Sequence, residues 1–428
     1  MSFNELALHP LVLNALTEGG YTEPTPVQAA AIPPALAGRD ILATAQTGTG
    51  KTAAFLLPSL TRIADLPPQR MPGAPRILVL APTRELAAQV TQAVRKYGKF
   101  MKLTSGDIVG GMPYRDQLRM LSRPVDVIVA TPGRLIDHVQ RGRIDLSEVE
   151  VLILDEADRM LDMGFAEDVD FIAQACSPVR QTLLFTATID RRMTGLANKL
   201  LRNPTRVAIE ATASTALLIE QRLHHCDDME HKRRLLHHFA SSDDVTKAIV
   251  FAATKRDADT LARGLNDAGH QSAALHGDMT QEQRNRTLQR LRNGQLRLLV
   301  ATDVAARGID VPDISHVINF DLPRAAEDYV HRIGRTGRAG AEGVAISFAA
   351  RADRDLVMRI ERYTKATLTL HVVPGLEPRP WAAHTPSPSS ARPSRGRPGG
   401  PSGKPWLKNK SEGSANKPQA NAHGARAR

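Results

Sequence analysis

The sequence predicts an α/β fold made of two successive domains of similar build. Short apolar runs alternate with amphipathic stretches along residues 1–370, which is the pattern of strands joined by helices. The pattern starts afresh after AIEATASTAL (208–217), a small, polar and weakly patterned stretch. Strand–helix alternation implies mainly parallel sheets covered by helices on both faces. We therefore expect domains at 1–207 and 218–370, a linker at 208–217 and a tail at 371–428.

The first domain contains five apolar runs that are short enough to be buried strands. A long amphipathic stretch among them, RELAAQVTQAVRKYGKF (84–100), is predicted to be a helix. The five predicted strands are ILATA (41–45), ILVLA (77–81), DVIVA (126–130), VLILD (151–155) and LLFTA (183–187).

The second domain repeats this pattern. Two helices are predicted at 254–269 and 280–294, and each ends near a glycine that can adopt a left-handed cap. The predicted strands are KAIVFAAT (247–254), QSAALHG (271–277), LRLLVATD (296–303), HVINFD (316–321) and GVAISFA (343–349).

The composition excludes several classes of protein. Hydrophobic residues make up 42% and charged residues 24%, as in globular proteins, and only 4% are aromatic, which disfavours an all-β sandwich. No run approaches the ~20 apolar residues of a membrane span, and MSFNELALHP lacks the features of a signal peptide. Two cysteines, Cys176 and Cys226, are too few for a disulfide framework. We expect a cytoplasmic protein without membrane contact.

The formal net charge of +11 is concentrated at the C-terminal end. Residues 371–428 carry +8, whereas residues 1–370 carry only +3. The same 58 residues contain ten Pro, seven Gly and seven Ser, so they cannot bury enough apolar surface to offset the entropy of ordering. We predict a disordered basic tail that either contacts a polyanion or only solubilises the chain.

A phosphate-binding loop is predicted at AQTGTGKT (45–52), between a strand and a helix. It fits G-x-x-x-x-G-K-[ST], with Ala45 in place of the first glycine. The alternative is a glycine-rich turn with a surface lysine. Glycines let the backbone approach phosphate oxygens, the lysine reaches the β- and γ-phosphates, and the threonine hydroxyl can hold Mg²⁺. The candidate residues are Ala45, Gln46, Thr47, Gly48, Thr49, Gly50, Lys51 and Thr52.

An acidic partner for this loop follows the apolar run VLIL. Asp155 stands at the carboxyl end of that predicted strand, where ligands bind in open α/β sheets. We expect Asp155 to hold Mg²⁺, partly through water, and Glu156 to orient and deprotonate the attacking water. Together with the loop, this predicts hydrolysis of a nucleoside triphosphate.

These residues resemble the DEAD-box RNA helicases, because Asp155, Glu156, Ala157 and Asp158 spell the family tetrapeptide. The resemblance covers about residues 1–370 and implies two RecA-like domains, ATP and Mg²⁺ as ligands, and RNA as substrate. YTEPTPVQ (21–28) is similar to the segment that recognises adenine. Gln28 would then read the base, and Tyr21 would contact the nucleotide. Phe3 is either a second such contact or a core anchor.

The resemblance extends to the segments that contact RNA. In the first domain PTRELA (82–87), a Gly-Gly pair and TPGR (131–134) match, and in the second domain ALHGDM (274–279) and ATDVAARGID (301–310) match. Phosphate and sugar contacts are what such hydroxyl, guanidinium and backbone donors provide. The implied RNA-binding residues are Pro82, Thr83, Arg84, Gly110, Gly111, Thr131, Arg134, His276, Gly277, Thr302 and Asp303.

Further matches imply nucleotide contacts from the second domain. Gly308 and Asp310 would touch the ribose. Arg335 and Arg338, from HRIGRTGR (331–338), would reach the γ-phosphate as arginine fingers. The alternative is that these arginines, with Arg332, form a solvated basic stripe, since their spacing of three places them on one helical face.

One position departs from the family pattern. The usual Ser-Ala-Thr is Thr186-Ala187-Thr188 here, so the hydroxyl is kept and a methyl is added. Thr186 and Thr188, with Asp158 and His331, would couple the nucleotide site to the domain interface. The direct start at Phe3 and the basic tail are similar to the RhlE-type bacterial branch.

The resemblance implies that ATP and RNA together close the two domains, bend the strand and open a few base pairs of a short duplex. An ATP-gated RNA clamp and a DNA-translocating motor are the alternatives. We expect a monomer acting on duplex and single-stranded RNA, with ribosomal precursors or decay machinery as partners. The histidines at 224, 225, 231, 237 and 238 fit no standard metal-site spacing.

Overall fold

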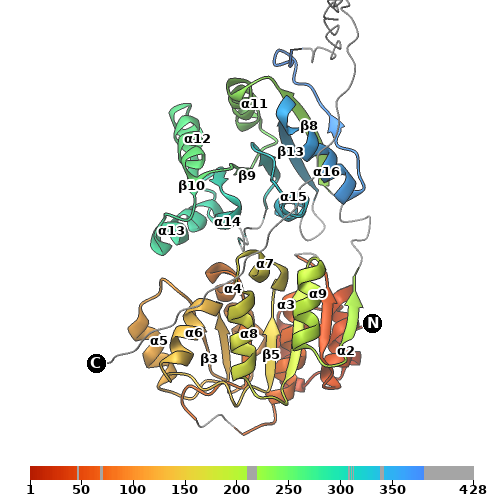
Figure 1. The fold of residues 1–428 in the computed structure, drawn as a ribbon, viewed down its shortest axis with the longest axis vertical. Coiled ribbons are helices and arrows are strands. Elements are labelled where there is room, and N and C mark those ends of the chain that lie inside the picture. Colours follow the sequence, from red (N-terminus) through yellow and green to blue (C-terminus); the bar gives the residue numbers. More distant parts are fainter. Residues whose placement is uncertain are drawn as a thin grey trace, which may run out of the picture. The chain divides into compact units, whose positions relative to one another are not determined.

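The computed structural model describes residues 1–45, 48–67, 71–209, 219–306, 309, 311, 313–337 and 342–379. Two seven-stranded sheets run through these residues, and every strand pairing in them is parallel (Figure 1). We call the described residues up to 209 the N-terminal lobe and those from 219 the C-terminal lobe. The predicted α/β class with two similar units is confirmed. None of the helices in these residues is long and apolar enough to cross a membrane.

The N-terminal lobe begins with short helices and then alternates strands with helices. Its helices are η1 (Phe3–Leu6), α1 (Pro10–Glu18), α2 (Pro26–Leu36), α3 (Lys51–Ile63), α4 (Arg84–Tyr97), α5 (Tyr114–Leu121), α6 (Pro132–Gln140), α7 (Ala157–Asp162), α8 (Ala166–Ala175) and α9 (Arg191–Leu200). Its strands are β1 (Ile41–Thr44), β2 (Ile77–Leu80), β3 (Ser105–Ile108), β4 (Val127–Ala130), β5 (Val151–Leu154), β6 (Gln181–Thr186) and β7 (Thr205–Ala208).

The C-terminal lobe follows the same alternation. Its strands are β8 (Ile219–Cys226), β9 (Ala248–Phe251), β10 (Ser272–Leu275), β11 (Leu298–Ala301), β12 (His316–Asn319), β13 (Gly343–Ala350) and β14 (Thr369–Leu370). Its helices are α11 (Met229–Ser241), α12 (Lys255–Asp267), α13 (Gln281–Arg292), α14 (Asp303–Ala306), α15 (Ala326–Ile333), η2 (Arg351–Asp353) and α16 (Arg354–Thr364).

The two sheets have the same strand order. It is β3-β4-β2-β5-β6-β1-β7 in one lobe and β10-β11-β9-β12-β13-β8-β14 in the other, which is the same permutation when strands are counted along the chain. The repeat inferred from the sequence is therefore a repeat of topology. In both sheets the carboxyl ends of the strands lie at one edge, where open α/β proteins bind their ligands.

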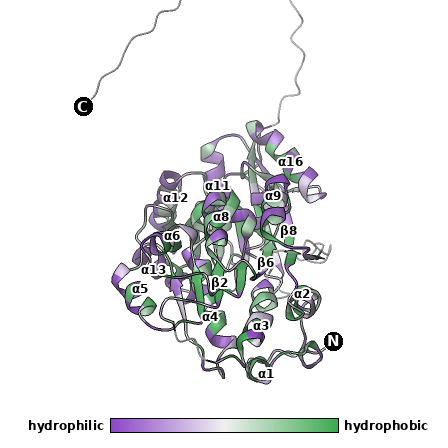
Figure 2. Ribbon diagram, turned by 60° about the horizontal axis from the view of Figure 1, so that its bottom comes forward, coloured by the Kyte–Doolittle hydropathy of each residue, from purple (hydrophilic) through white to green (hydrophobic). Residues whose placement is uncertain are grey.

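Each sheet is covered on both faces, because alternate strand residues point to opposite sides. In the N-terminal lobe Val79 and Ile153 join a core with α1 to α4, whereas Leu78 and Leu152 join a second core with α6 to α9. Figure 2 shows the result: the strands are mainly hydrophobic and the helices mix both kinds of residue. The predicted continuous apolar strands are buried for this reason.

The strands that the sequence analysis missed are mostly at sheet edges. β3, β7 and β14 are edge strands, where one side has no neighbouring strand, so their sequences need less apolar content. β8 was missed because five of its eight residues are polar, in the runs EQR and HH, so it has no continuous apolar run. The predicted helices end where expected: Gly269 and Gly294 follow α12 and α13 with φ of 87° and 73°, which glycine adopts without a Cβ penalty.

The first residues assigned to the tail are part of the C-terminal lobe. The backbone N–H of His371 donates to the Leu223 carbonyl at 2.8 Å, and Val373 is buried in the core. The imidazole of His231 bonds the Leu376 carbonyl at 3.0 Å. The ordered unit therefore extends to at least residue 379, beyond the expected end at 370. The rest of the predicted tail, 380–428, and most of the predicted linker, 210–217, lie outside the described residues.

Candidate nucleotide and RNA site

The phosphate loop and the acidic tetrapeptide meet at the carboxyl edge of the first sheet. β5 pairs with β6, and β6 pairs with β1, so the segments that leave these strands are neighbours. The backbone N–H of Ala45 donates to the Thr186 carbonyl at 3.0 Å, which ties the start of the loop to the end of β6. Asp155 follows β5 directly. The topology thus assembles residues that are separated by more than 100 positions in the chain.

The loop needs its two described glycines for different reasons. Gly48 and Gly50 have φ of 85° and 92°, a region that side chains with a Cβ rarely adopt. A Cβ at Gly50 would also collide with the Gln28 amide, whereas the space beside Gly48 is open. Gly50 is the N-cap of α3, so the start of that helix faces the site. Gln46 and Thr47 lie outside the described residues.

Gln28 is built into the wall of this loop. Its Nε2 donates to the Gly50 carbonyl at 3.0 Å, and its Oε1 accepts from the Thr25 backbone N–H at 3.0 Å. Gln28 is buried, and the Thr25 hydroxyl beside it is buried without a hydrogen-bond partner. The amide is therefore held in one orientation next to an unsatisfied polar group. Base recognition by Gln28 remains a prediction.

A cluster of buried charges lies where the loop meets the tetrapeptide. Lys51, Asp155, Glu156 and Arg159 are each less than 9% exposed. Each has a buried polar atom without a hydrogen-bond partner: Nζ of Lys51, Oδ1 of Asp155, Oε2 of Glu156 and one terminal guanidinium nitrogen of Arg159. Buried polar atoms are nearly always paired, because an unpaired one costs free energy. The donor set fits a polyphosphate on the lysine and a hard cation on the carboxylate.

Burial and neighbouring charges move the two carboxyl groups of this cluster in opposite directions. Burial raises the pKa of Asp155 to about 7, against the attraction of Lys51. Burial would also raise the pKa of Glu156, but Arg159, Lys51 and Arg335 outweigh it and lower that pKa. The Nε of Arg159 lies 3.4 Å from Oε2 of Glu156. Glu156 is therefore held as a carboxylate, and its φ of 51° shows a locally strained backbone.

The predicted coupling residues of the first lobe form one network around Asp158. Its Oδ2 accepts from the backbone N–H groups of Ala187 and Thr188 and from the Thr188 hydroxyl, at 2.9 to 3.1 Å. The Thr186 hydroxyl instead donates to the Thr188 carbonyl at 2.7 Å. The residue that departs from the family pattern therefore holds the turn, and Thr188 makes the hydroxyl contact to Asp158.

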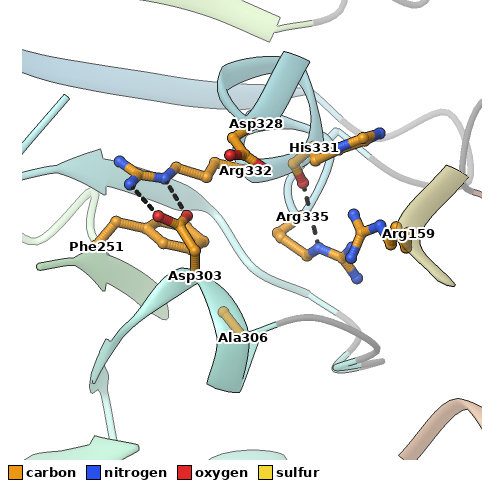
Figure 3. Close-up of a pocket in the computed structure, with 8 residues that line it drawn as sticks. All are labelled: Arg159, Phe251, Asp303, Ala306, Asp328, His331, Arg332 and Arg335. Carbon is orange, nitrogen blue, oxygen red and sulfur yellow. Dashed lines mark hydrogen bonds and ion pairs between the residues drawn. The ribbon is translucent and has the colours of Figure 1, made fainter. Parts of the chain in front are cut away.

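Figure 3 shows a pocket lined by Arg159 of α7 and by residues of the C-terminal lobe, among them His331, Arg332 and Arg335. Arg335 donates to the carbonyls of Ile309 and His331 at 2.9 and 3.3 Å. Burial, and to a smaller extent the positive charge of Arg159, lowers the pKa of His331 to about 3, so its imidazole is neutral. Arg335 is 5% exposed, and Arg332 is buried too. The solvated basic stripe is therefore wrong for these two arginines.

Arg332 is bound to a residue that we predicted to contact RNA. Its Nε and Nη2 lie 2.6 and 2.7 Å from the two carboxylate oxygens of Asp303 (Figure 3). Its Nη1 donates to Asn319 and to the Asp321 carbonyl. In this structure Asp303 thus positions α15. An RNA contact by Asp303 remains a prediction.

The predicted RNA-binding residues of the N-terminal lobe surround Arg84. A Cβ at Gly111 would collide with the Arg84 guanidinium, and one at Gly110 would come within 3.3 Å of it. The Gly-Gly pair therefore lets this side chain lie against the backbone. Arg134 donates to the Met112 carbonyl at 3.3 Å nearby. Thr83 caps α4 by accepting from the Leu86 N–H.

The remaining predicted RNA-binding residues stand at the ends of strands. Pro82 follows β2, Thr131 caps α6 directly after β4, and Thr302 follows β11. His276 and Gly277 follow β10, and the His276 imidazole lies 3.0 Å from Asp259. All these strand ends lie at the carboxyl edges of their sheets.

Sequence reasoning missed an ion pair that joins the matched segment at 82–87 to α13. The guanidinium of Arg284 lies 2.7 Å from Oε1 of Glu85, and both side chains are about nine-tenths buried. Gln281 accepts from Arg84 at 3.2 Å beside it. Arg159 was also missed. No local signal marks such residues, because a charged residue on a helix is usually solvated, and only the fold brings the partners together.

The last predicted contacts are settled only in part. Phe3 is 4% exposed and belongs to the core, which favours the core-anchor alternative. Tyr21 lies against α4, where Lys96 donates to its hydroxyl at 2.8 Å. His224 packs edge-on against Phe239, which explains one of the clustered histidines. Gly308, Asp310 and Arg338 lie outside the described residues.

Comparison with known proteins identifies the family. The model of the DEAD/DEAH box helicases matches residues 25–195, and that of the helicase conserved C-terminal domain matches residues 228–340. The chain belongs to the DEAD-box family of RNA helicases. The family is one of ATP-hydrolysing enzymes, and this chain is an ATP-dependent RNA helicase in which RNA unwinding is coupled to ATP and to domain closure.

Individual helicases are similar over most of the chain. The ATP-dependent RNA helicase SrmB of Haemophilus influenzae is 46% identical over 88% of this chain and 86% of its own length. SrmB of Escherichia coli is 45% identical over 88% and 85%. Among solved structures, Dbp5 of Saccharomyces cerevisiae bound to RNA and ADP BeF3 superposes with a TM-score of 0.78 at 34% identity, covering 87% of this chain and 95% of that one.

Proposed function

We propose that ATP binds where the phosphate loop meets the DEAD tetrapeptide, and that its hydrolysis drives local opening of short RNA duplexes. The observation that carries this proposal is the cluster of four buried charges with unpaired polar atoms. A ligand that completes these hydrogen bonds would remove this cost. A triphosphate with its cation supplies both the anion for Lys51 and the cation for Asp155.

Each residue of the cluster has a role that follows from its surroundings. Lys51 binds the β- and γ-phosphates, and Thr52 and Asp155 hold Mg²⁺, partly through water. When bound, Mg²⁺ offsets the charge that develops on the phosphates. Glu156 orients the attacking water and takes its proton, and its lowered pKa keeps it charged for this task. Gln28 and Tyr21 contact the base.

Arg335 and Arg338 act on the γ-phosphate as arginine fingers. Arg335 is supported by its position beside Glu156, whose pKa it lowers. In the structure Arg335 donates to the Ile309 carbonyl, a contact that it would exchange for a phosphate oxygen. Asp158, Thr186, Thr188 and His331 couple the nucleotide to the domain interface, and Gly308 and Asp310 contact the ribose.

RNA is held mainly through its backbone by the candidates around Arg84 and His276. Because a bent strand cannot stay in a regular duplex, closure would displace a few base pairs at a time. We propose that the protein acts as a monomer in the cytoplasm, in the RhlE-type branch of the family. Ribosomal precursors or the decay machinery are the proposed partners, and the tail from residue 380 to 428 is proposed to add phosphate contacts.

RNA-stimulated ATPase activity tests the site assignment. Lys51→Ala should lose ATP binding, because the ammonium that faces the phosphates is removed. Glu156→Gln should bind ATP and RNA but turn over about 10²–10⁴-fold more slowly, as expected when a general base is lost. Lys102→Ala, an exposed lysine of the same lobe, is the matched control. Full RNA-stimulated activity in both site variants would refute the assignment.

Strand displacement distinguishes local opening from the alternatives. Unwinding should fall steeply as the duplex lengthens, because each cycle opens only a few pairs. Efficient unwinding of very long duplexes would favour a translocating motor. A long-lived RNA complex without displacement would favour a clamp.

A further inference from the structure

A hollow on the C-terminal lobe lies between the start of α15 and the face of α16. These two helices pack against one another. The hollow is lined by Arg324, Ala325, Glu327, Arg359, Arg362 and Tyr363, and no residue of the phosphate loop, the tetrapeptide or the matched RNA segments is among its lining residues.

The side chains of this hollow converge because of helical spacing. Arg359, Arg362 and Tyr363 are three and four positions apart on α16, so they share one face of the helix. Arg324 reaches the same space from the segment before α15. The Tyr363 side chain is 41% exposed, so part of its ring faces solvent.

The charge of the lining is not balanced within the protein. None of the three guanidinium groups has a hydrogen-bond or ion-pair partner in the part of the chain that the structure describes. Glu327 is the one acidic residue of the lining, which leaves an excess of positive charge. Like charges held close together repel, and a bound anion would remove this cost.

The combination of groups favours RNA over an acidic protein segment. Guanidinium groups bind phosphate oxygens in a bidentate manner, and an exposed aromatic ring offers a base a surface for stacking. The non-polar lining is alanine, which gives no large apolar anchor of the kind that protein interfaces use at their centre. RNA is also the polyanion that the established activity already brings to this lobe.

Arg324 lies at the opposite end of α15 from His331, whereas Tyr363 is close enough to Glu327 and to Asp158 of the tetrapeptide for their charges, after burial, to raise its pKa. His331 is in the last turn of this helix, and Arg335 follows it. Eight residues at 1.5 Å each separate the ends by about 12 Å. We therefore expect that a longer RNA is needed to contact the main groove and the arginines of the hollow at the same time.

We propose that this hollow is a second RNA site, which binds the single-stranded segment flanking the duplex that is being opened. The proposal rests on the RNA helicase activity of the family and deepens it. Arg324, Arg359 and Arg362 contact phosphates, and Tyr363 stacks on a base. The site would anchor the enzyme on the loading strand while the lobes open and close.

Binding of two RNAs to the full chain tests the proposal. One is the shortest oligonucleotide that fully stimulates the ATPase, and the other is the same oligonucleotide extended at one end. In Arg359→Ala/Arg362→Ala the salt slope for the extended RNA should flatten by about 1.4, at roughly 0.7 per lost phosphate contact on single strands. Affinity for the short RNA, and the ATPase rate that it stimulates, should not change. Arg351→Ala/Arg354→Ala removes the same charge from nearby exposed positions and should affect both RNAs equally.

A second variant removes the stacking surface without altering charge. Tyr363→Leu should weaken binding of the extended RNA about tenfold, as expected for loss of one stacked base, and Tyr363→Phe should bind as the wild type. Unchanged binding of the extended RNA in both the arginine and the leucine variants would overturn the proposal. Equal weakening of short-RNA binding in these variants would also overturn it. So would variants that lose binding to an oligoglutamate peptide but keep binding to the extended RNA. Because ATPase stimulation is measured separately, failure of the second site is distinguishable from failure of the main site.

Discussion

The two lobes share a strand order, but they differ in whether particular buried charges at their sheet edges are paired. In the N-terminal lobe Lys51 and Asp155 are buried with unpaired polar atoms. In the C-terminal lobe Arg332 is bound by Asp303, Asn319 and the Asp321 carbonyl. In the first arrangement a ligand that pairs these atoms would remove the free-energy cost of leaving them unpaired. In the second arrangement the ion pair and hydrogen bonds hold α15 in place. An identical topology therefore carries a candidate binding site in one lobe and a structural network in the other.

The variant with the largest expected effect removes Arg332 from its network with Asp303 and Asn319. Arg332→Met leaves Asp303 without its partner and should destabilise the C-terminal lobe by about 3–5 kcal/mol, the usual cost of removing one member of a buried ion pair. Arg351→Met, at an exposed position, is the control. Chemical unfolding followed by circular dichroism measures both. If Arg332→Met costs no more than the control, the network is not structural.

The second largest effect is a gain in stability, and it concerns Asp155, one of the buried charges with an unpaired polar atom. Because burial raises the pKa of Asp155 to about 7, the folded state binds more protons than the unfolded state between pH 4 and pH 7. The contribution of Asp155 to stability is therefore full below about pH 4 and is lost as the pH rises through about 7. Asp155→Asn should stabilise the nucleotide-free protein by about 2–4 kcal/mol at pH 8 and by little at pH 4.

Urea unfolding at several pH values, with Asp267→Asn as an exposed control, measures this difference. The same variant should lose ATPase activity, so stability and activity would change in opposite directions. If Asp155→Asn lowers the stability at pH 8, the Asp155 carboxylate has a stabilising partner, and the two lobes do not differ in the way described.

The smallest effect concerns the departure from the family pattern. Thr186→Ser keeps the hydroxyl that donates to the Thr188 carbonyl but removes a buried methyl group. It should cost about 0.5–1.5 kcal/mol, as for other buried methyl deletions, and preserve ATPase activity. Thr186→Ala removes the hydrogen bond as well and should cost more. Equal losses in the two variants would show that the hydrogen bond contributes nothing. Strand displacement in the serine variant measures whether the methyl affects coupling.

The sequence was informative where chemistry depends on neighbours in the chain. The loop around Lys51 and the strand before Asp155 were both predicted, because a strand end and a helix start require local patterns that can be recognised. The meeting of the two segments followed from the parallel sheet. The strands with continuous apolar runs were predicted as well, whereas polar edge strands were not.

The residues that were missed depend on partners far away in the chain. Glu85 and Arg284 are 199 positions apart, and each alone looks like a solvated helical charge. The bond between Arg332 and Asp303 was missed for the same reason, because Arg332 entered only the alternative of a solvated stripe and Asp303 was predicted to contact RNA. The roles of Thr186 and Thr188 were separated only by the geometry of the turn that joins them.

The sequence by itself determined the fold class, the repeat, the position of the glycine-rich loop between a strand and a helix, and the family, because these rest on periodicity and on short motifs. The tertiary structure alone decided which charges are paired. Pairing depends on which side chains the sheets bring within about 3 Å of one another, and on how much water the packing excludes around them. That distinction separates the unpaired charges of Lys51 and Asp155 from the structural network of Arg332, and it marks the arginines of the hollow on α16 as a candidate second RNA site.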